Sequence, residues 1–271
     1  MESKILKYEE LAELRKQLED IGVATESQNR LPMFEPTLKP QYQKRVYEGK
    51  YGKLLVEGRL GQAHKNLLEA ILWKREAHTY IEIEGKEHLK VAYDREKIRK
   101  YLSQSSKYSY AKYKELLKDM IQTYIELETD KVRIKGTLIM KVQESLVKKP
   151  TKGKSPIIPE ETPLTVVIFG DVATALIDKE LRFTYDPKPI MKLDSGISQA
   201  IVRFLKTHQS HPQAGYHLKG LVANLIENVE GQKWWDIRRL LKKDAEKLED
   251  LGIAIDFKQD RLYVVDGKVK V

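Results

Sequence analysis

The stretch that decides the fold closes the chain: residues 234–271, WWDIRRLLKKDAEKLEDLGIAIDFKQDRLYVVDGKVKV. Its first half repeats apolar residues three and four positions apart, which predicts one amphipathic helix over about residues 234–251. The inward positions of that helix are Trp234, Ile237, Leu241 and Leu248. The second half alternates apolar and polar residues around Gln259-Asp260, which predicts a two-stranded hairpin. A winged helix ends in this order, with a long helix followed by a hairpin.

Two more predicted helices precede this stretch. The run ISQAIVRFLKTH, residues 197–208, follows a capping residue at Asp194 or Ser195 and repeats apolar residues at helical spacing. A loop around Pro212 leads to a second helix, LKGLVANLIE, which ends before a break at Gly231. The order is therefore helix, helix, longer helix and hairpin, which is the three-helix core and β-wing of a winged helix.

The middle of the chain repeats this order with one extra hairpin. Residues 62–75 and about 109–122 predict amphipathic helices, and Asp94 caps a short helix between them. Alternation around Gly85-Lys86 and around Thr129-Asp130 predicts two hairpins, of which the second would be a wing. The two halves share this pattern of elements and no obvious sequence repeat.

These elements predict an α+β fold: two tandem winged-helix domains with an N-terminal helical arm. The arm combines an amphipathic helix over residues 7–21, for packing on the body or pairing with another chain, and an extended segment over 30–52. The predicted parts are residues 1–52, the N-terminal helix and arm; 53–193, the first winged-helix domain with a Lys/Pro-rich loop near 148–163; and 194–271, the second winged-helix domain.

The composition is that of a globular protein, with 41% hydrophobic and 33% charged residues and a net charge of +9. No run approaches the roughly 18 apolar residues of a membrane helix, and the acidic, polar start is unlike a signal peptide. The absence of cysteine excludes disulfides and thiolate metal sites, so we expect a cytoplasmic protein. The positive excess lies in residues 51–150, with 21 Lys/Arg against 14 Asp/Glu, and favours nucleic acid as the partner.

In a winged helix the third helix enters the major groove of DNA, so its outward side should be polar and cationic. In the predicted helix over 109–122, the core side holds Tyr113, Leu117, Met120 and Ile121. The candidate DNA-binding residues on its other side are Lys107, Tyr108, Lys112 and Lys118, with Ala111 as a contact for a thymine methyl group. An ordinary solvated helix face is the alternative.

The last helix offers a denser set of cations. Its candidate DNA-binding residues are Trp235, Arg238, Arg239, Lys242 and Lys243. Trp235 on a cationic side is unusual, and it either contacts DNA or packs on the other domain. The hairpins supply further candidates for phosphate contact, namely Lys131, Arg133, Lys258 and Arg261.

From about residue 164 onward the chain resembles plasmid replication initiators of the TrfA type, which are related to iteron-binding Rep initiators. The resemblance is carried by ISQAIVRFLKTHQSHPQAGYHLKGLVANLI, in which a helix ends in a His-containing turn, then Pro, then a Leu-rich helix. It continues in WWDIRRLLKKDAEKLEDLGIAIDF, which is similar to the family's pattern of Arg, Lys and then Leu-x-x-Leu-Gly. About 100 residues fit well, and the first domain fits only by its order of elements.

The resemblance implies two winged helices, of which the C-terminal one docks on repeated sites of a double-stranded DNA origin. Such proteins open the origin and recruit the host replication initiator and the replicative helicase without hydrolysing nucleotide. Arg238, Arg239, Lys242 and Lys243 then correspond to the family's DNA-reading helix. The segment 107–118 corresponds more loosely to that of the first domain. The resemblance also suggests a homodimer, although residues 7–21 match no pairing motif of the family.

The motifs of several enzyme classes are missing. There is no P-loop, and GDVA after a strand is too sparse for a dinucleotide-binding fingerprint. His208, His211 and His217 lie in a Pro-containing loop without metal-ligand spacing, and no His-x-His motif of nicking initiators is present. Paired carboxylates such as Glu160-Glu161 lack an accompanying His or nucleophile. We therefore expect no catalytic residues, no metal, no cofactor, no enzymatic activity and no membrane partner.

Two other functions use the same modules. A transcriptional regulator or autorepressor would bind an inverted repeat through the same residues, so residue chemistry does not separate it from an initiator. An assembly protein could use both winged helices for protein contacts alone. Salt-dependent binding to duplex DNA would decide against the last reading, since phosphate contacts make affinity fall steeply with salt.

Overall fold

The computed structural model describes residues 21–103, 108–148, 161–226 and 229–271. The predicted helix over 7–21 therefore lies outside the described residues except for its last position, Ile21, which is buried. Within those four ranges no helix is both long and apolar enough to cross a membrane.

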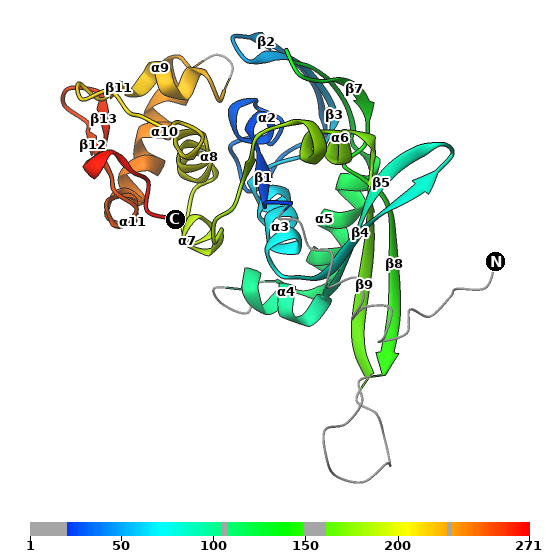
Figure 1. The fold of residues 1–271 in the computed structure, drawn as a ribbon. Helices are drawn as coiled ribbons and strands as arrows, with labels where there is room; N and C mark the ends of the chain where they lie inside the picture. Colours follow the sequence, from blue (N-terminus) through cyan, green and yellow to red (C-terminus); the bar gives the residue numbers. More distant parts are fainter. Residues whose placement is uncertain (1–20, 104–107, 149–160, 227–228) are drawn as a thin grey trace, which may run out of the picture.

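The described chain is mixed α/β, and Figure 1 shows how its elements are arranged. The helices are α2 (Glu26–Arg30), α3 (Gln62–Trp73), α4 (Arg95–Leu102), α5 (Tyr110–Gln122), α6 (Asp171–Lys179), α7 (Lys188–Met191), α8 (Gly196–Lys206), α9 (Leu218–Ala223), α10 (Gly231–Lys243) and α11 (Ala245–Asp250), with a 3₁₀ turn at Val265–Gly267. The strands are β1 (Ala24–Thr25), β2 (Gln43–Gly49), β3 (Gly52–Gly58), β4 (Arg75–Ile83), β5 (Lys86–Asp94), β6 (Tyr124–Glu128), β7 (Arg133–Gly136), β8 (Ile139–Lys148), β9 (Glu161–Phe169), β10 (Arg182–Phe183), β11 (Tyr216–His217), β12 (Ile253–Asp256) and β13 (Arg261–Val264).

The named strands pair only in the antiparallel sense. Two four-stranded sheets, in the orders β2-β3-β6-β7 and β4-β5-β9-β8, belong to the N-terminal part, and β1 pairs with β10. The C-terminal part carries a small sheet in the order β11-β13-β12. In Figure 1 the two large sheets lie on one side of α3, and α8 to α11 with the small sheet lie on the other. Antiparallel sheets with separate helices make this an α+β arrangement.

Helix α3 lies at the centre of one continuous hydrophobic core. Residues 62–72 are buried on every side of the helix, as expected of a helix enclosed by other elements rather than one on the surface. The core cluster runs from Ile21 to Val269 and takes in residues from α5, β9, α8 and α10. We call residues 194–271 the C-terminal module and the preceding described residues the N-terminal module. The two modules share this core.

A buried polar network joins the modules through α3 and α8. Arg203 of α8 is 2% exposed, and its guanidinium donates to Glu69 Oε1 at 2.9 Å and Glu69 Oε2 at 2.6 Å. It also donates to Gln62 Oε1 at 2.6 Å and Asn66 Oδ1 at 2.7 Å, both on α3. The Tyr185 hydroxyl donates to Glu69 at 2.8 Å. Such a buried charge is tolerated because it is paired and hydrogen-bonded.

Lys65 is a second buried cation one turn before Glu69. Its Nζ lies 3.9 Å from Glu69 Oε1 and donates to Gln28 Oε1 at 3.2 Å. Burial lowers the pKa of Lys65 to about 7; Glu69 opposes this shift, whereas Arg203 adds to it. Arg203 is therefore the permanent cation of the network, and Lys65 is a group that loses its proton near neutrality.

The local signals of the sequence predicted several elements correctly. Asp94 caps α4 by accepting from the amides of Glu96 and Lys97, and Ser109 and Ser195 cap α5 and α8. The hairpin β4–β5 forms with Ile83 opposite Lys86, so its two turn residues are Glu84 and Gly85, one position earlier than predicted. Both have positive φ, 52° and 75°, as a two-residue hairpin turn requires.

The predicted extended arm over residues 30–52 is only partly correct. Its three prolines, at positions 32, 36 and 40, all precede residue 43, and the segment that follows them is the edge strand β2. This strand pairs with β3, with Gln43 opposite Gly58 at one end and Gly49 opposite Gly52 at the other. The proline signal therefore ends before the strand begins, and the alternating residues after it enter a sheet.

The predicted single helix over residues 234–251 is wrong at Asp244, where α10 ends and α11 begins. The Asp244 side chain is buried and accepts from the amides of Asp194 at 2.8 Å and Ser195 at 2.9 Å. A carboxylate at this point satisfies two amides at the start of α8 and complements the positive end of that helix. This tertiary contact interrupts a helical repeat that continues through the sequence.

The wing predicted for the first module is also different from the observed hairpin. β6 and β7 do form a hairpin, but β6 pairs with β3 as well, so the hairpin is part of a four-stranded sheet. The apolar run after Gly136 leaves that sheet as β8 and pairs with β9. Lys148 and residues 161–163 of the predicted Lys/Pro-rich loop belong to these two strands, and residues 149–160 lie outside the described part.

The first prediction concerns the buried pair between the modules. Arg203→Met should lower the free energy of unfolding by about 3–5 kcal/mol, because it leaves the Glu69 carboxylate buried without its cation. Urea unfolding measures this loss. Lys86→Met, at an exposed position at the start of β5, is the control and should change stability by about 0.5 kcal/mol or less. A loss below about 1 kcal/mol in Arg203→Met would show that the network is not essential to the junction.

The second prediction concerns the pH dependence of stability. The pKa of Lys65 is about 7 in the folded chain and near 10.4 when unfolded, so the unfolded chain binds more protons between these values. The stability should therefore rise from pH 7.5 to pH 9.5, by on the order of 1 kcal/mol per pH unit at most. Lys65→Met should flatten this rise. An unchanged slope in the variant would assign the pH dependence to other groups.

Candidate nucleic-acid interface

The C-terminal module has the element order α8, β11, α9, α10, α11, β12 and β13. α10 packs against α8, and β13 lies between β11 and β12, so the terminal hairpin is extended by a third strand. Figure 1 shows α10 between α8 and this small sheet. The hairpin β12–β13 therefore lies beside α10. Its turn, residues 257–260, lies next to this helix.

One face of α10 seals the module, and the other is open to solvent. Ile237 and Leu241 are buried, and Trp234 is half-buried against the core. On the open side Trp235 is 70% exposed, and the side chains of Arg239 and Lys243 are 80% and 66% exposed. Lys242 is also exposed. Trp235 thus does not pack on the N-terminal module, which was the alternative considered for it.

The open cations of α10 have partners that orient them without covering them. Arg239 Nη2 donates to Asp236 Oδ1 at 3.1 Å, one turn earlier on the helix. Lys243 Nζ lies 3.4 Å from Asp194 Oδ2. The hydrogen bond from Lys247, and then that from Lys243, hold the pKa of Asp194 below its usual value. Lys242 Nζ lies 5.4 Å from the centre of the Phe257 ring, in the hairpin turn.

Arg238 faces the hairpin rather than open solvent. It donates a hydrogen bond to the carbonyl oxygen of Phe257, and its Nη1 lies 3.5 Å from Asp260 Oδ1. Its guanidinium also lies 5.8 Å from the ring centres of both Trp234 and Phe257. The same Asp260 accepts from the amide of Leu218 through its backbone oxygen at 2.8 Å. Arg238 therefore fixes the hairpin turn to α10, and Asp260 fixes that turn to the start of α9.

Lys258 and Arg261, which were predicted to contact phosphate from the C-terminal hairpin, differ in their accessibility to solvent. Lys258 is exposed at the turn. Arg261 is half-buried, and its Nη1 donates to the carbonyl oxygen of Gly215 at 3.4 Å. Lys258 is thus the more accessible of the two cations.

The candidate helix of the N-terminal module, α5, is less cationic than predicted. Lys107 lies outside the described residues. Tyr108 is partly buried against the core, and burial raises its pKa, so its assignment to the outward side is wrong. Lys112 pairs with Glu115 at 3.0 Å, and this hydrogen bond is the main cause that lowers the pKa of Glu115. Lys118 is exposed.

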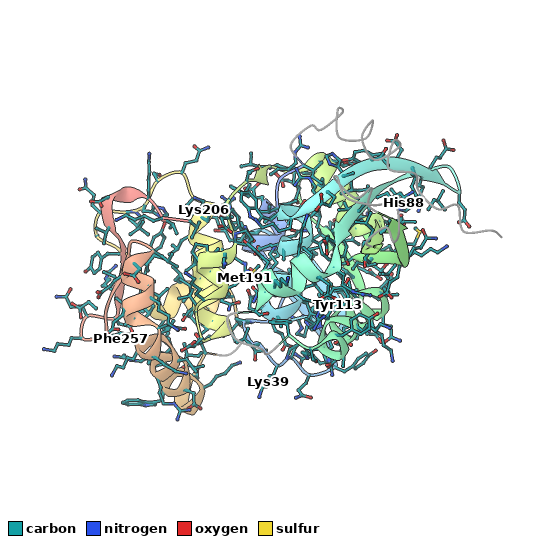
Figure 2. All side chains as sticks on the ribbon, turned by 90° about the horizontal axis from the view of Figure 1, so that it is seen from below. Lys39, His88, Tyr113, Met191, Lys206 and Phe257 are labelled. Carbon is teal, nitrogen blue, oxygen red and sulfur yellow. The ribbon has the colours of Figure 1, made fainter. Side chains whose placement is uncertain are left out.

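Two exposed cations of the N-terminal module were not among the candidates predicted from the sequence. Lys114 lies on α5 with its Nζ 4.5 Å from the ring centre of Tyr110. Lys39 lies within the proline segment before β2, directly before Pro40, and is exposed. In Figure 2 the labelled Tyr113 of α5, Lys39 and Phe257 lie toward one side of the view, whereas His88 and Lys206 lie toward the other.

The hairpin β6–β7 adds no comparable patch. Lys131 Nζ donates to Glu26 Oε2 at 2.7 Å, and Arg133, although 84% exposed, lies 3.5 Å from Glu128. The outer face of this sheet also carries Glu48 and Glu126, so charges of both signs alternate on it. A surface of this kind repels as many phosphates as it attracts, unlike the open side of α10.

The described residues contain no group of three His, Cys, Asp or Glu side chains that could hold a metal ion. His208 and His211 instead lie in an aromatic cluster. The His208 ring is 4.8 Å from that of Phe204, and His211 Nδ1 is 2.9 Å from the Tyr216 hydroxyl. Burial lowers the pKa of both histidines.

No protein-family model and no curated protein matches the chain. Among solved structures, a selenomethionine derivative of domains 2 and 3 of RctB is 14% identical with a TM-score of 0.49, over 90% of this chain and 96% of that chain. A second structure of RctB domains 2-3 is 14% identical with a TM-score of 0.46, over 81% of this chain and 80% of that chain.

The third prediction tests Arg238 as the residue that holds the hairpin turn. Arg238→Met should lower the free energy of unfolding by about 1–3 kcal/mol, because it leaves Asp260 without its cation. The matched control is Arg239→Met on the next residue, which should change stability by about 0.5 kcal/mol or less. Urea unfolding of both variants compares them directly. Equal stability of the two would mean that the hairpin is held without Arg238.

Proposed function

We propose that this protein is a non-enzymatic, sequence-specific binder of double-stranded DNA, built from two winged helices. The observation that carries the proposal is the open side of α10, where Trp235, Arg239, Lys242 and Lys243 face solvent while the opposite side seals the core. A helix with this division fits the major groove, about 12 Å wide, with cations toward phosphates and base edges.

The residues of α10 divide by position along the helix. Arg239 lies just past the middle of α10 and is oriented by Asp236, and it is the open cation that we assign to guanine acceptors. Lys242 and Lys243 lie toward the C-terminal end and contact phosphates. Lys258 and Arg261 contact phosphate from the wing, and Arg238 positions that wing.

The N-terminal module provides a second, weaker contact. Lys114 and Lys118 of α5, and Lys39 of the proline segment, offer exposed cations to the phosphate backbone. The same helix carries Glu115 and Asp119, which pair with Arg59 from the segment between β3 and α3, so this surface is less cationic than that of α10. The buried Arg203–Glu69 pair joins the two contacts, and their separation along the DNA is therefore fixed by the protein.

We further propose that the DNA is a replication origin with repeated sites, as the resemblance of residues 197–257 to TrfA-type initiators implies. In this role the protein opens the origin, with the host initiator and the replicative helicase as partners, and it works in the cytoplasm as a monomer or homodimer. The plasmid role rests on the sequence motif alone.

Selection of bound sequences from random duplex DNA tests the function. An initiator should enrich tandem repeats spaced by about two helical turns beside an A·T-rich tract, where strands separate easily. Enrichment of inverted repeats would instead assign a transcriptional regulator or autorepressor. Binding that is absent, or that does not weaken with salt, would leave the protein-assembly reading and overturn the proposal.

The fourth prediction concerns Arg239. Arg239→Ala should weaken binding to the selected site by ~1–3 kcal/mol, because a bidentate contact to guanine is lost. The matched control is Lys86→Ala, since Lys86 is also exposed and carboxylate-paired, 3.0 Å from Asp171, but lies on the hairpin that holds His88 in Figure 2. Titration at fixed salt should show the loss only in Arg239→Ala.

Comparison with random DNA completes this test. An equal loss on random and selected duplex would make Arg239 a phosphate contact without sequence preference. No loss on either would remove it from the interface.

A further inference from the structure

Trp235 is an exposed aromatic residue in the N-terminal half of α10. It is 70% exposed, whereas its neighbour Trp234 is half-buried with Arg238 against its ring. Within the described part of the chain, no ring stacking and no cation–π contact involves Trp235. The helix therefore presents a large apolar ring to solvent beside the residues that carry the proposed function.

Trp235 shares its side of α10 with cations, of which Arg239 is paired with Asp236. Arg239 follows one turn later on the same side of the helix, and Lys242 follows Arg239 three positions on. An exposed tryptophan commonly marks an interface. An apolar protein partner would have to cover these cations without compensating them, which costs free energy. A duplex compensates them with phosphates, so the charge pattern favours nucleic acid as the occupant of this face.

The major groove offers one apolar feature for such a ring. Each base pair presents hydrogen-bond donors and acceptors there, and thymine alone adds a methyl group at C5. Trp235 lies in the half of α10 that enters the groove, one turn before Arg239. Stacking on unpaired bases fits the surface less well, because single-strand binding relies on several aromatic side chains in a row. On α10, the described side chains include only this one exposed aromatic.

We propose that Trp235 selects thymine in the DNA site by packing its indole ring against the 5-methyl group. This inference rests on the proposed function of α10 and adds its base preference. The sequence read by the helix then contains at least one thymine close to a guanine, since Trp235 and Arg239 lie one helical turn apart. Removal of this methyl group from the DNA should lower the affinity through the loss of the Trp235 contact alone.

Substitution of uracil for thymine tests the proposal, because uracil pairs with adenine as thymine does and lacks only the methyl group. In the selected duplex, each thymine is replaced singly and affinity is measured for the full-length protein. The wild type should lose roughly fourfold in affinity at one or two positions, as expected for one buried methyl group. Trp235→Ala should bind the thymine site more weakly and should not distinguish thymine from uracil.

The control variant is Arg239→Ala, which should keep the wild-type sensitivity to uracil while it loses affinity. The effects of the uracil substitution and of Trp235→Ala should therefore be non-additive, as expected when the ring contacts the methyl group directly. The effects of the uracil substitution and of Arg239→Ala should add. Urea unfolding of Trp235→Ala should match the wild type, because an exposed side chain contributes little to stability.

Three results would overturn the proposal. If wild-type affinity does not change with uracil at any position while Arg239→Ala still weakens binding, α10 reads DNA without Trp235. Binding of Trp235→Ala as tight as that of the wild type gives the same conclusion. Preference of the wild type for a single strand over the duplex, lost in Trp235→Ala, would assign the ring to base stacking. If the wild type selects no duplex sequence, the proposed function itself fails.

Discussion

The buried pair between Arg203 and Glu69 holds the two halves of the molecule in one arrangement. Hydrophobic residues of similar size would often give a junction of equal or greater stability, so the pair is better understood as a device for orientation than for strength. Arg203 donates in several fixed directions, to Glu69, Gln62 and Asn66 on successive turns of α3. A rotation or shift of α8 along α3 would break these bonds together. The exposed surfaces on either side of the junction therefore keep a constant relation.

The orientation of α10 likewise depends on charged side chains that join two elements, here within the C-terminal module. Asp244 ends the helix because its carboxylate is needed at the start of α8, and this contact sets the direction in which α10 leaves the core. Arg238 then fixes the hairpin turn to the helix through Phe257 and Asp260. The cations that face solvent are therefore carried on a helix anchored at its C-terminal end and along one side. Rigid support of this kind lowers the entropy lost when a surface binds its partner.

The sequence predicted what local chemistry determines. Capping residues such as Asp94 and Ser195, and the period of the apolar residues in α3 and α10, set most helices and showed which side of α10 faces out. Pairing between distant segments could not be predicted in this way, because alternation looks the same whichever partner a strand finds. β2 and β8 were therefore misassigned, and Lys39 was not recognised as a candidate although its extended segment was predicted. The end of α10 at Asp244 was not predicted, because a tertiary contact and not a local signal ends the helix. The plasmid role of the candidate site stays a prediction.

The fixed relation between the modules has a consequence for the geometry of the proposed complex. In B-form DNA, one added base pair lengthens the helix by about 3.4 Å and rotates the adjoining duplex by roughly 35°, since a turn holds 10–10.5 base pairs. A protein with a flexible linker would accommodate such a rotation by swivelling. A protein with one continuous core cannot, so the duplex itself must twist to present both contacts in phase. Torsional stress in the DNA and occupancy by this protein are thereby coupled.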